Sequence, residues 1–463
     1  LGAHLEVQLR DAPQQRRPMG ASAWALSEVH PVTLVAMWPG EDAPTKTEVL
    51  ASLPQFEGAG IAEVEELEST SDDILWNAVL EFPHISSRVI LWAEAAKPMP
   101  GSGLENTAIG ACRWIVGAEL ALSPEEPLRD FSGAMRLLGG LSDDVPAVLD
   151  VNTGQWHMRD SLQLSFLDPG AEPPDEVLWV VHAVTAAEGP AADKVWLYTS
   201  GLWRCGRPEL EMLEVPRRHV ESAVAMLNAV AGIMLETTTP DPGVPFEIGS
   251  GLEVTLQPWR DVIAFLDESA HGSMRDRRLE PGHEDDASNP LGGVRAVICG
   301  PHPVGAYRPI WTWPREAIER IETEHGTLYQ TKSATRRQQR LAQRMLPEFA
   351  VALASVQHDG VPLDADGAPG FFAKVGFRVT DDDDADFEHL WFRLTQLDGP
   401  RMEGLLLNPP QLLQEMTAGE RRWFDQAQVS WWHVAVGEEG FGPESAEAMS
   451  RAIDAWRQRR SAS

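Results

Sequence analysis

The sequence predicts an α+β protein of several domains, in which mixed or antiparallel sheets carry flanking helices. The length of 463 residues suggests two or three domains at roughly 150 residues each. Hydrophobic residues make up 43% of the chain, which is enough to bury ordinary cores. Short apolar and β-branched runs also alternate with segments of helical period, and this alternation is typical of sheets layered with helices.

The first two thirds of the chain show this alternation clearly. Thr45 and Glu48 form a capping box, which predicts the start of a short helix. Apolar residues spaced three or four apart predict a helix with one buried stripe from Val220 to Met234. Residues 275–293 are polar and predict a long loop or lid. The other expected strands are 32–38, 74–82, 89–92, 145–151, 177–184, 194–199 and 294–299, and the other expected helices are 128–141 and one that begins at Pro314.

The last third predicts a small C-terminal domain of antiparallel sheet plus helix. Residues 333–356 form an amphipathic helix that Pro347 is expected to kink. Residues 371–379 and 387–397 alternate cleanly and predict two antiparallel strands joined by an acidic turn. A strand at 402–407 precedes a helix expected from Asn408 to Gly419, with Pro409 at its first position.

The two ends of the chain are expected to differ from its middle. Residues 1–18 are polar and predict a disordered leader or arm, with Met19 as the natural start. Residues 19–329 are expected to form an α+β region. Its length allows two subdomains, with a boundary near residues 120–145. A C-terminal helix or tail is expected at residues 443–463.

The charge and the cysteines limit the classes of partner. With 38 Lys and Arg against 70 Asp and Glu, the net charge of −32 argues against nucleic acid and against an anionic membrane surface. The three cysteines, Cys112, Cys205 and Cys299, are widely spaced and predict no disulfide framework. The longest uncharged apolar run, residues 222–235, is too short for a membrane span. We therefore expect a cytoplasmic protein without a membrane or nucleic-acid partner.

The best candidate for chemistry is the segment 203–211. Arg204 and Arg207 could depress the pKa of Cys205 and make a reactive thiolate, while Glu209 and Glu211 could act as acid and base. The alternative is that Cys205 is a small buried residue and that the arginines and glutamates pair structurally in a turn between a strand and a helix. The second interpretation is favoured, because no base lies nearby in the sequence.

Metal and cofactor sites are not supported by the sequence. The acidic cluster from Asp381 to Asp386 lacks the Gly and Glu of a calcium loop, and His283 to Asp286 has no second histidine at ligand spacing. Phosphate-loop, serine-hydrolase and zincin motifs do not occur. We expect no cofactor and no metal. His389 alternates with Glu388 and is expected to be a half-buried, hydrogen-bonded structural residue.

Tryptophan is unusually frequent, with 17 Trp against 3 Tyr. Trp side chains could form a platform for a ligand or partner, since they supply large contact area at little entropic cost. Packing in the core is the favoured alternative, because most of them lie within strand or helix patterns. The candidate binding residues are Trp203, Arg204, Arg207, Trp391, Trp431 and Trp432.

The C-terminal part contains the segments FFAKVGF (371–377), EHLWFRL (388–394), EGLLLNPP (403–410), AGE (418–420) and VSWWHV (429–434). In these segments it resembles a bacterial family of unknown function, the YegJ-like domain, and the resemblance predicts a domain over residues 330–442. The family more often has Asp-Trp where this chain has Trp431 and Trp432. The segment YTSGLWRCGRPELEMLEVP (198–216) resembles a second uncharacterised bacterial domain that is often fused in front; its relatives often have a His near the position of Ser200. The resemblance implies this architecture and no established activity.

Three functions remain open at this point. The favoured one is a non-catalytic interaction or accessory module that binds a protein partner, because no convergent catalytic set accompanies the two resembling segments. The second is an enzyme of unrecognised class with its site at residues 205–211. The third is an immunity or defence protein that binds a basic partner, which rests on the net charge of −32.

Overall fold

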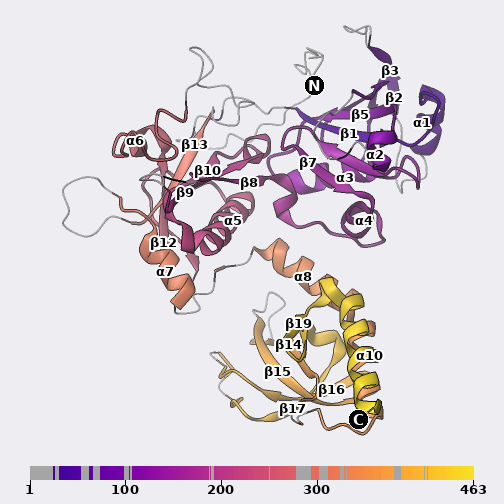
Figure 1. The fold of residues 1–463 in the computed structure, drawn as a ribbon, viewed down its shortest axis with the longest axis vertical. Helices are drawn as coiled ribbons and strands as arrows, with labels where there is room; N and C mark the ends of the chain where they lie inside the picture. Colours follow the sequence, from indigo (N-terminus) through magenta and orange to yellow (C-terminus); the bar gives the residue numbers. More distant parts are fainter. Residues whose placement is uncertain are drawn as a thin grey trace. The chain divides into compact units, whose positions relative to one another are not determined.

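The protein divides into two compact units, residues 1–331 and residues 332–463, which we call unit 1 and unit 2 (Figure 1). The computed structural model describes residues 24, 26, 31–53, 62–65, 73–97, 104, 107–186, 188, 192–249, 251–277, 293–301, 311–323, 328–329, 331–363, 365, 367–379, 387–410, 412–413 and 415–462. None of the helices in these ranges has the length and apolar composition that crossing a bilayer requires. The expected leader or arm at 1–18 lies outside them.

The first sheet of unit 1 is antiparallel throughout, in the order β2-β3-β4-β5-β1-β6-β7. Its central strand is buried on both faces: Val32 and Leu34 face the core under helix α3 (Pro127–Gly139), and Val35 and Met37 face a smaller cluster with Ile109. The strands are β1 (Val32–Trp38), β2 (Ala62–Glu65), β3 (Ile74–Glu81), β4 (Val89–Ala95), β5 (Trp114–Leu120), β6 (Ala147–Asp150) and β7 (Gln155–Met158), accompanied by α1 (Lys46–Ser52), α2 (Ala108–Ala111) and α4 (Arg159–Leu162).

The second sheet of unit 1 is mixed, in the order β11-β12-β13-β10-β9-β8, with β10 and β13 parallel and the other pairs antiparallel. Helix α5 (Val220–Glu236) packs Leu227 and Val230 against one face, where Leu210 and Met212 project from β10. The strands are β8 (Val180–Val184), β9 (Lys194–Ser200), β10 (Glu209–Pro216), β11 (Phe246–Gly249), β12 (Leu252–Pro258) and β13 (Arg295–Cys299), with α6 (Trp259–Ile263) and α7 (Arg315–Thr323).

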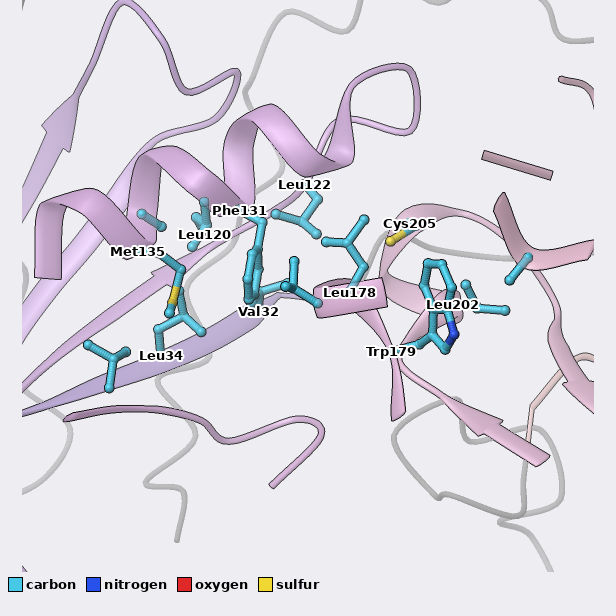
Figure 2. Close-up of a cluster of buried hydrophobic side chains, with 14 of the residues drawn as sticks. Val32, Leu34, Leu120, Leu122, Phe131, Met135, Leu178, Trp179, Leu202 and Cys205 are labelled. Carbon is cyan, nitrogen blue, oxygen red and sulfur yellow. The ribbon is translucent and has the colours of Figure 1, made fainter. Parts of the chain in front are cut away.

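One hydrophobic core runs through both sheets of unit 1. Figure 2 shows Phe131 of α3 and Val32 of β1 beside Leu178, with Leu202 and Cys205 from the turn before β10 further along the same cluster. The turn that holds Cys205 is therefore part of the core, and its side chains are positioned by packing from both sheets.

Unit 2 is a single antiparallel sheet in the order β17-β16-β15-β14-β18-β19. Its core contains Phe349 and Leu353 of helix α9 and Met449 and Ile453 of helix α10, and α10 runs alongside the sheet in Figure 1. The elements are α8 (Lys332–Arg344), α9 (Leu346–His358), β14 (Gly370–Arg378), β15 (Phe387–Asp398), β16 (Arg401–Leu406), β17 (Arg421–Asp425), β18 (Val429–Val436), β19 (Glu439–Phe441) and α10 (Ala446–Ala462).

The predicted fold class is confirmed, as are several individual elements. Thr45 Oγ1 accepts a hydrogen bond from the backbone N–H of Glu48 at 3.2 Å, which completes the predicted capping box. Strands β14 and β15 pair antiparallel, as the alternation predicted. The acidic turn expected between them lies outside the described residues. Instead of one kinked helix over 333–356 there are two, and Pro347 lies in the first turn of α9, where a missing N–H costs nothing.

The helix predicted from Asn408 to Gly419 is wrong: the described residues of this segment are not helical. Asn408 Oδ1 accepts the backbone N–H of Trp391 at 2.8 Å, so it does not cap a helix. The backbone N–H groups of Leu412 and Leu413 donate to Glu388 Oε2 at 3.0 and 2.8 Å. These bonds to strand β15 replace the hydrogen bonds that a helix would have supplied.

Candidate functional site

The turn that contains the candidate residues joins two antiparallel strands, β9 and β10, whereas the sequence predicted a strand followed by a helix. A single 3₁₀ turn, Leu202–Cys205, lies between them. Gly201 begins this turn with φ at 128°, and a Cβ there would lie 2.4 Å from the carbonyl oxygen of Leu178. Only glycine fits this conformation and this close approach, so Gly201 fixes the direction in which the turn enters the core.

Cys205 is fully buried in that core. Burial raises the pKa of its thiol to about 12, which outweighs the opposite effect of Arg204 and Arg207. A thiol with this pKa is protonated at neutral pH, and the thiolate is the nucleophile. The depressed pKa that the first interpretation requires is therefore not found, and the environment of Cys205 corresponds to the second interpretation.

Both arginines of the turn have structural partners. Arg204 is buried and forms an ion pair with Asp150 of β6, with N–O distances of 2.8 and 2.7 Å. Its Nη2 also donates to the carbonyl oxygen of Leu178 at 2.9 Å. Arg207 donates to the carbonyl oxygens of Met234 at 2.5 Å and Pro124 at 3.3 Å. These two side chains tie the turn to the first sheet and to the end of α5.

Glu209 is buried at the start of β10 and serves as a hydrogen-bond acceptor for the turn. Its Oε1 accepts the backbone N–H groups of Gly201 at 2.7 Å and Trp203 at 3.2 Å. Its Oε2 accepts the hydroxyl of Thr199 at 2.5 Å. By accepting these donors in a buried turn, Glu209 stabilises the turn in the way that a helix N-cap stabilises a helix end.

Glu211 lies two residues further along β10 and is held between two buried arginines. Arg277 Nη1 donates to Glu211 Oε1 at 2.9 Å, and Arg277 Nη2 and Arg295 Nε form close ion pairs with the same carboxylate. Burial alone would raise the pKa of Glu211, but Arg295 and Arg277 outweigh it and hold the pKa below its usual value. Glu211 is therefore ionised at neutral pH as part of a three-residue charge cluster.

Aromatic rings cover the two arginines of this cluster. The guanidinium of Arg277 lies 5.0 Å from the ring centroid of Trp196 and 4.7 Å from that of Trp259. The guanidinium of Arg295 lies 5.3 Å from the ring of Tyr198. Cation–π contacts of this kind are strongest when the cation is desolvated, as it is here. The cluster is thus a well-packed core network. Neither Arg277 nor Arg295 is among the candidate residues predicted from the sequence.

A signal for two of the missed residues was present in the sequence. Arg295, like Glu211, interrupts a run of apolar strand residues, and a charge inside a buried strand needs a partner of opposite sign. Asp150 ends the apolar run of β6 in the same way. Sequence alone does not pair them, because Glu211 is 66 residues from Arg277 and 84 from Arg295.

The burial of the thiols predicts their reactivity. In the native protein near pH 8, we expect iodoacetamide to modify Cys112 first, because that side chain is partly exposed whereas Cys205 and Cys299 are buried. Raising the pKa of Cys205 from 9.0 to about 12 lowers its thiolate fraction about a thousandfold. Mass spectrometry after timed quenching measures the three rates, with denatured protein as the control. Modification of native Cys205 faster than Cys112 would contradict this assignment.

Metal ligands are not gathered in the described part of the chain: no group of three or more His, Cys, Asp or Glu side chains there is arranged to hold an ion. The segment from His283 to Asp286 and the acidic cluster from Asp381 to Asp386 both lie outside the described ranges. The half-buried His389 forms a hydrogen bond through Nδ1 with the hydroxyl of Ser430 at 2.8 Å.

The tryptophan candidates fall in different places. Trp203 is buried in the turn of unit 1. In unit 2, Trp432 of β18 is fully buried in the core, stacks 5.0 Å from the ring of Phe349 and donates to the carbonyl oxygen of Ala342 at 3.1 Å. Trp391 and Trp431 lie on the opposite face of the same sheet and are partly exposed. Trp203 therefore belongs to unit 1, whereas the other three tryptophan candidates belong to unit 2. Of those three, Trp432 is a core residue.

Comparisons with known protein families match two segments. Residues 181–289 match the family described as "Protein of unknown function (DUF4026) C-terminal", which here runs from β8 past α6. Residues 342–459 match "Uncharacterized protein conserved in bacteria (DUF2314)", which here runs from the end of α8 to α10; the resemblance to YegJ-like domains at 330–442 is consistent with it. Comparison with curated proteins found no match, and comparison with solved structures found none. The chain thus contains one segment similar to the DUF4026 C-terminal family and one similar to the DUF2314 family, both of unknown function.

Proposed function

We propose that the protein is a non-catalytic interaction or accessory module that binds a protein partner. The observation that supports this proposal is the environment of the segment 203–211. Arg204 pairs with Asp150, Glu211 pairs with two arginines, and the thiol of Cys205 has its pKa raised to about 12. Catalytic groups need a pKa matched to their task and access to a substrate. Here the ionisable groups are used to hold the fold together.

We further propose a cytoplasmic location. The three cysteines are free thiols, and two of them are buried in the core of unit 1. Free thiols persist in reducing compartments, whereas small secreted domains usually pair them. The proposal does not depend on the charge of the chain.

Identification of a partner and its reconstitution test the proposed function. We expect affinity capture from native lysate to return a reproducible protein, and the purified pair to form a stoichiometric complex in sedimentation velocity. The Cys205→Ala variant should form the same complex, because that side chain is buried away from the surface.

The enzyme alternative makes the opposite prediction. If Cys205 were a nucleophile, the purified wild-type protein would convert a component of a metabolite extract, and Cys205→Ala would abolish the conversion while it kept its fold. That pair of results, detected by mass spectrometry of the extract, would overturn the proposed function. A complex that forms with the variant and an unchanged extract would support it.

A further inference from the structure

The sheet of unit 2 has two chemically different faces. Alternation along β14 sends Phe371, Ala373 and Val375 into the core with helices α9 and α10, and sends Phe372 and Lys374 to the other side. The same alternation on β15 and β18 places further aromatic side chains beside them. We call this second side the outer face, and define it by Phe372, Lys374, His389, Trp391, Trp431 and His433.

A lysine lies between two tryptophans at the middle of this face. Lys374 pairs in register with Trp391 on β15 and with Trp431 on β18, so the three residues form a row across three strands. Side chains directly opposite one another on neighbouring strands have Cβ atoms about 5 Å apart. The half-buried ammonium of Lys374 makes no hydrogen bond or ion pair with the residues that the structure describes. Burial lowers the pKa of Lys374.

The indole N–H groups separate these tryptophans from those that pack the core. Trp432 donates to the carbonyl oxygen of Ala342 at 3.1 Å, and Trp456 donates to that of Gly367 at 3.0 Å. Trp391 and Trp431 have no acceptor for their N–H groups within the described ranges. Buried tryptophans usually find such a partner, and tryptophans with an unused polar end are typical of interfaces. Trp391 also belongs to none of the core clusters, although Trp431 packs against the edge of one.

The histidines of the outer face lie over glycines. A Cβ at Gly376 would be 3.2 Å from Cε1 of His389, and a Cβ at Gly440 would be 2.7 Å from Cε1 of His433. The rings therefore occupy the positions where side chains of those glycines would stand. Burial, with a further contribution from Lys374, lowers the pKa of His389, so that ring is neutral at pH 7. Lys374 is thus the cation at the centre of a broad aromatic surface.

We propose that the outer face docks a protein segment that presents apolar side chains to Trp391 and Trp431 and one carboxylate to Lys374. The inference rests on the proposed function and names the surface and the chemistry of the partner. Charge complementarity supports the inference, because the half-buried ammonium of Lys374 lies between two indoles and has no carboxylate partner among the described residues, so a partner protein could supply one.

The charge distribution favours a protein over a nucleic acid. Unit 2 contains 15 Lys and Arg against 20 Asp and Glu, a net charge of −5, while the whole chain has −32. A polyanion needs several phosphates neutralised along its backbone, and the central row of the outer face contains one lysine. Of the two arginines that alternation places on the same face, Arg393 donates to the carbonyl oxygen of Leu363 at 3.3 Å and Arg378 lies over the ring of Phe387. A single carboxylate within an apolar segment therefore matches Lys374.

The test measures binding of a defined probe to the full-length chain. The probe is a short dye-labelled synthetic peptide that alternates Leu and Glu, with an alternating Leu and Gln peptide for comparison, and fluorescence anisotropy reports binding. We expect saturable binding of the Leu-Glu peptide, weakened about tenfold or more by Lys374→Glu and by Trp391→Ala. Lys374→Met keeps the packing of the alkyl chain and removes the charge, so it should weaken binding even if the charge reversal disturbs the fold.

Arg451→Glu is the matched control, because it makes the same charge change at an exposed position on α10. It should bind the Leu-Glu peptide like the wild type. The inference is overturned if the Leu-Glu peptide does not bind, if the Leu-Gln peptide binds equally well, if folded Lys374→Met binds like the wild type, or if a short oligothymidylate binds more tightly at the same face.

A captured partner separates this inference from the proposed function. If the partner binds Lys374→Glu and the wild type equally, the outer face is not the docking site, while the proposed function stands. If no partner is found but the peptide binds as expected, the proposed function fails and the outer face remains a site for acidic apolar segments.

Discussion

Replacing Glu211 with Gln should lower the free energy of unfolding by about 3–5 kcal/mol, the range seen when one partner of a buried ion pair is removed. The change leaves the buried guanidinium groups of Arg277 and Arg295 without the carboxylate that both contact. It also weakens the acceptor for the indole N–H of Trp196, which lies 3.2 Å from Glu211 Oε2. Urea denaturation followed by circular dichroism measures the effect.

Glu214→Gln is the control, because it makes the same chemical change on the same strand. Glu214 is only partly buried and lies 3.4 Å from the amine of Lys194. Partly exposed pairs contribute about 0–1 kcal/mol, so this variant should be close to the wild type. Equal stability of the two variants would show that the cluster around Glu211 is not a stabilising network.

The pH dependence of unfolding gives an independent check on Glu211. Because its pKa in the folded protein is held below the unfolded value by Arg295 and Arg277, against the effect of burial, the native state favours the ionised carboxylate. This contribution is present above the unfolded pKa of about 4.3 and is lost as the pH falls through the folded pKa. The wild type should therefore lose stability more steeply than Glu211→Gln in this acidic range.

The elements that the sequence predicted correctly are those whose hydrophobic pattern determines them. Strands β14 and β15 alternate over most of their length, and one face of each is buried in the core of unit 2. A register shift by one residue would expose that entire face, so the alternation fixes both pairing and orientation. The same alternation placed Trp391 in the predicted strand 387–397. The face of Trp432 follows from the observed pairing of β18 with β14, which includes a bulge.

Contacts between distant residues explain why the helix at Asn408 was predicted wrongly and why the reactive interpretation of Cys205 was the less favoured one. Asn408 followed by Pro409 is a good local signal for a helix start, but the Asn408 side chain binds the backbone of Trp391 instead. Arg204 beside Cys205 suggests an activated thiol, but the guanidinium of Arg204 forms an ion pair with Asp150, which is 54 residues away in the sequence. Local chemistry indicates what a residue could do, and the tertiary partner decides what it does.

Replacing Trp432 with Ala should destabilise unit 2 by about 3–5 kcal/mol, the usual cost of removing a buried aromatic side chain. The indole is fully buried, stacks against Phe349 and donates a hydrogen bond to Ala342, so its removal leaves both a cavity and an unpaired carbonyl. Thermal or urea unfolding of the full chain, followed by a probe in unit 2, measures the loss.

The contrast with Trp391 makes this prediction specific. Trp391→Ala removes the same side chain from the outer face of the same sheet, where the indole is partly exposed and belongs to no core cluster. We expect a loss of about 1 kcal/mol or less, within the range of ordinary surface substitutions. Its effect should appear in peptide binding instead. If the two variants were equally destabilised, the division of this sheet into a core face and a docking face would be wrong, because both indoles would then be serving the fold.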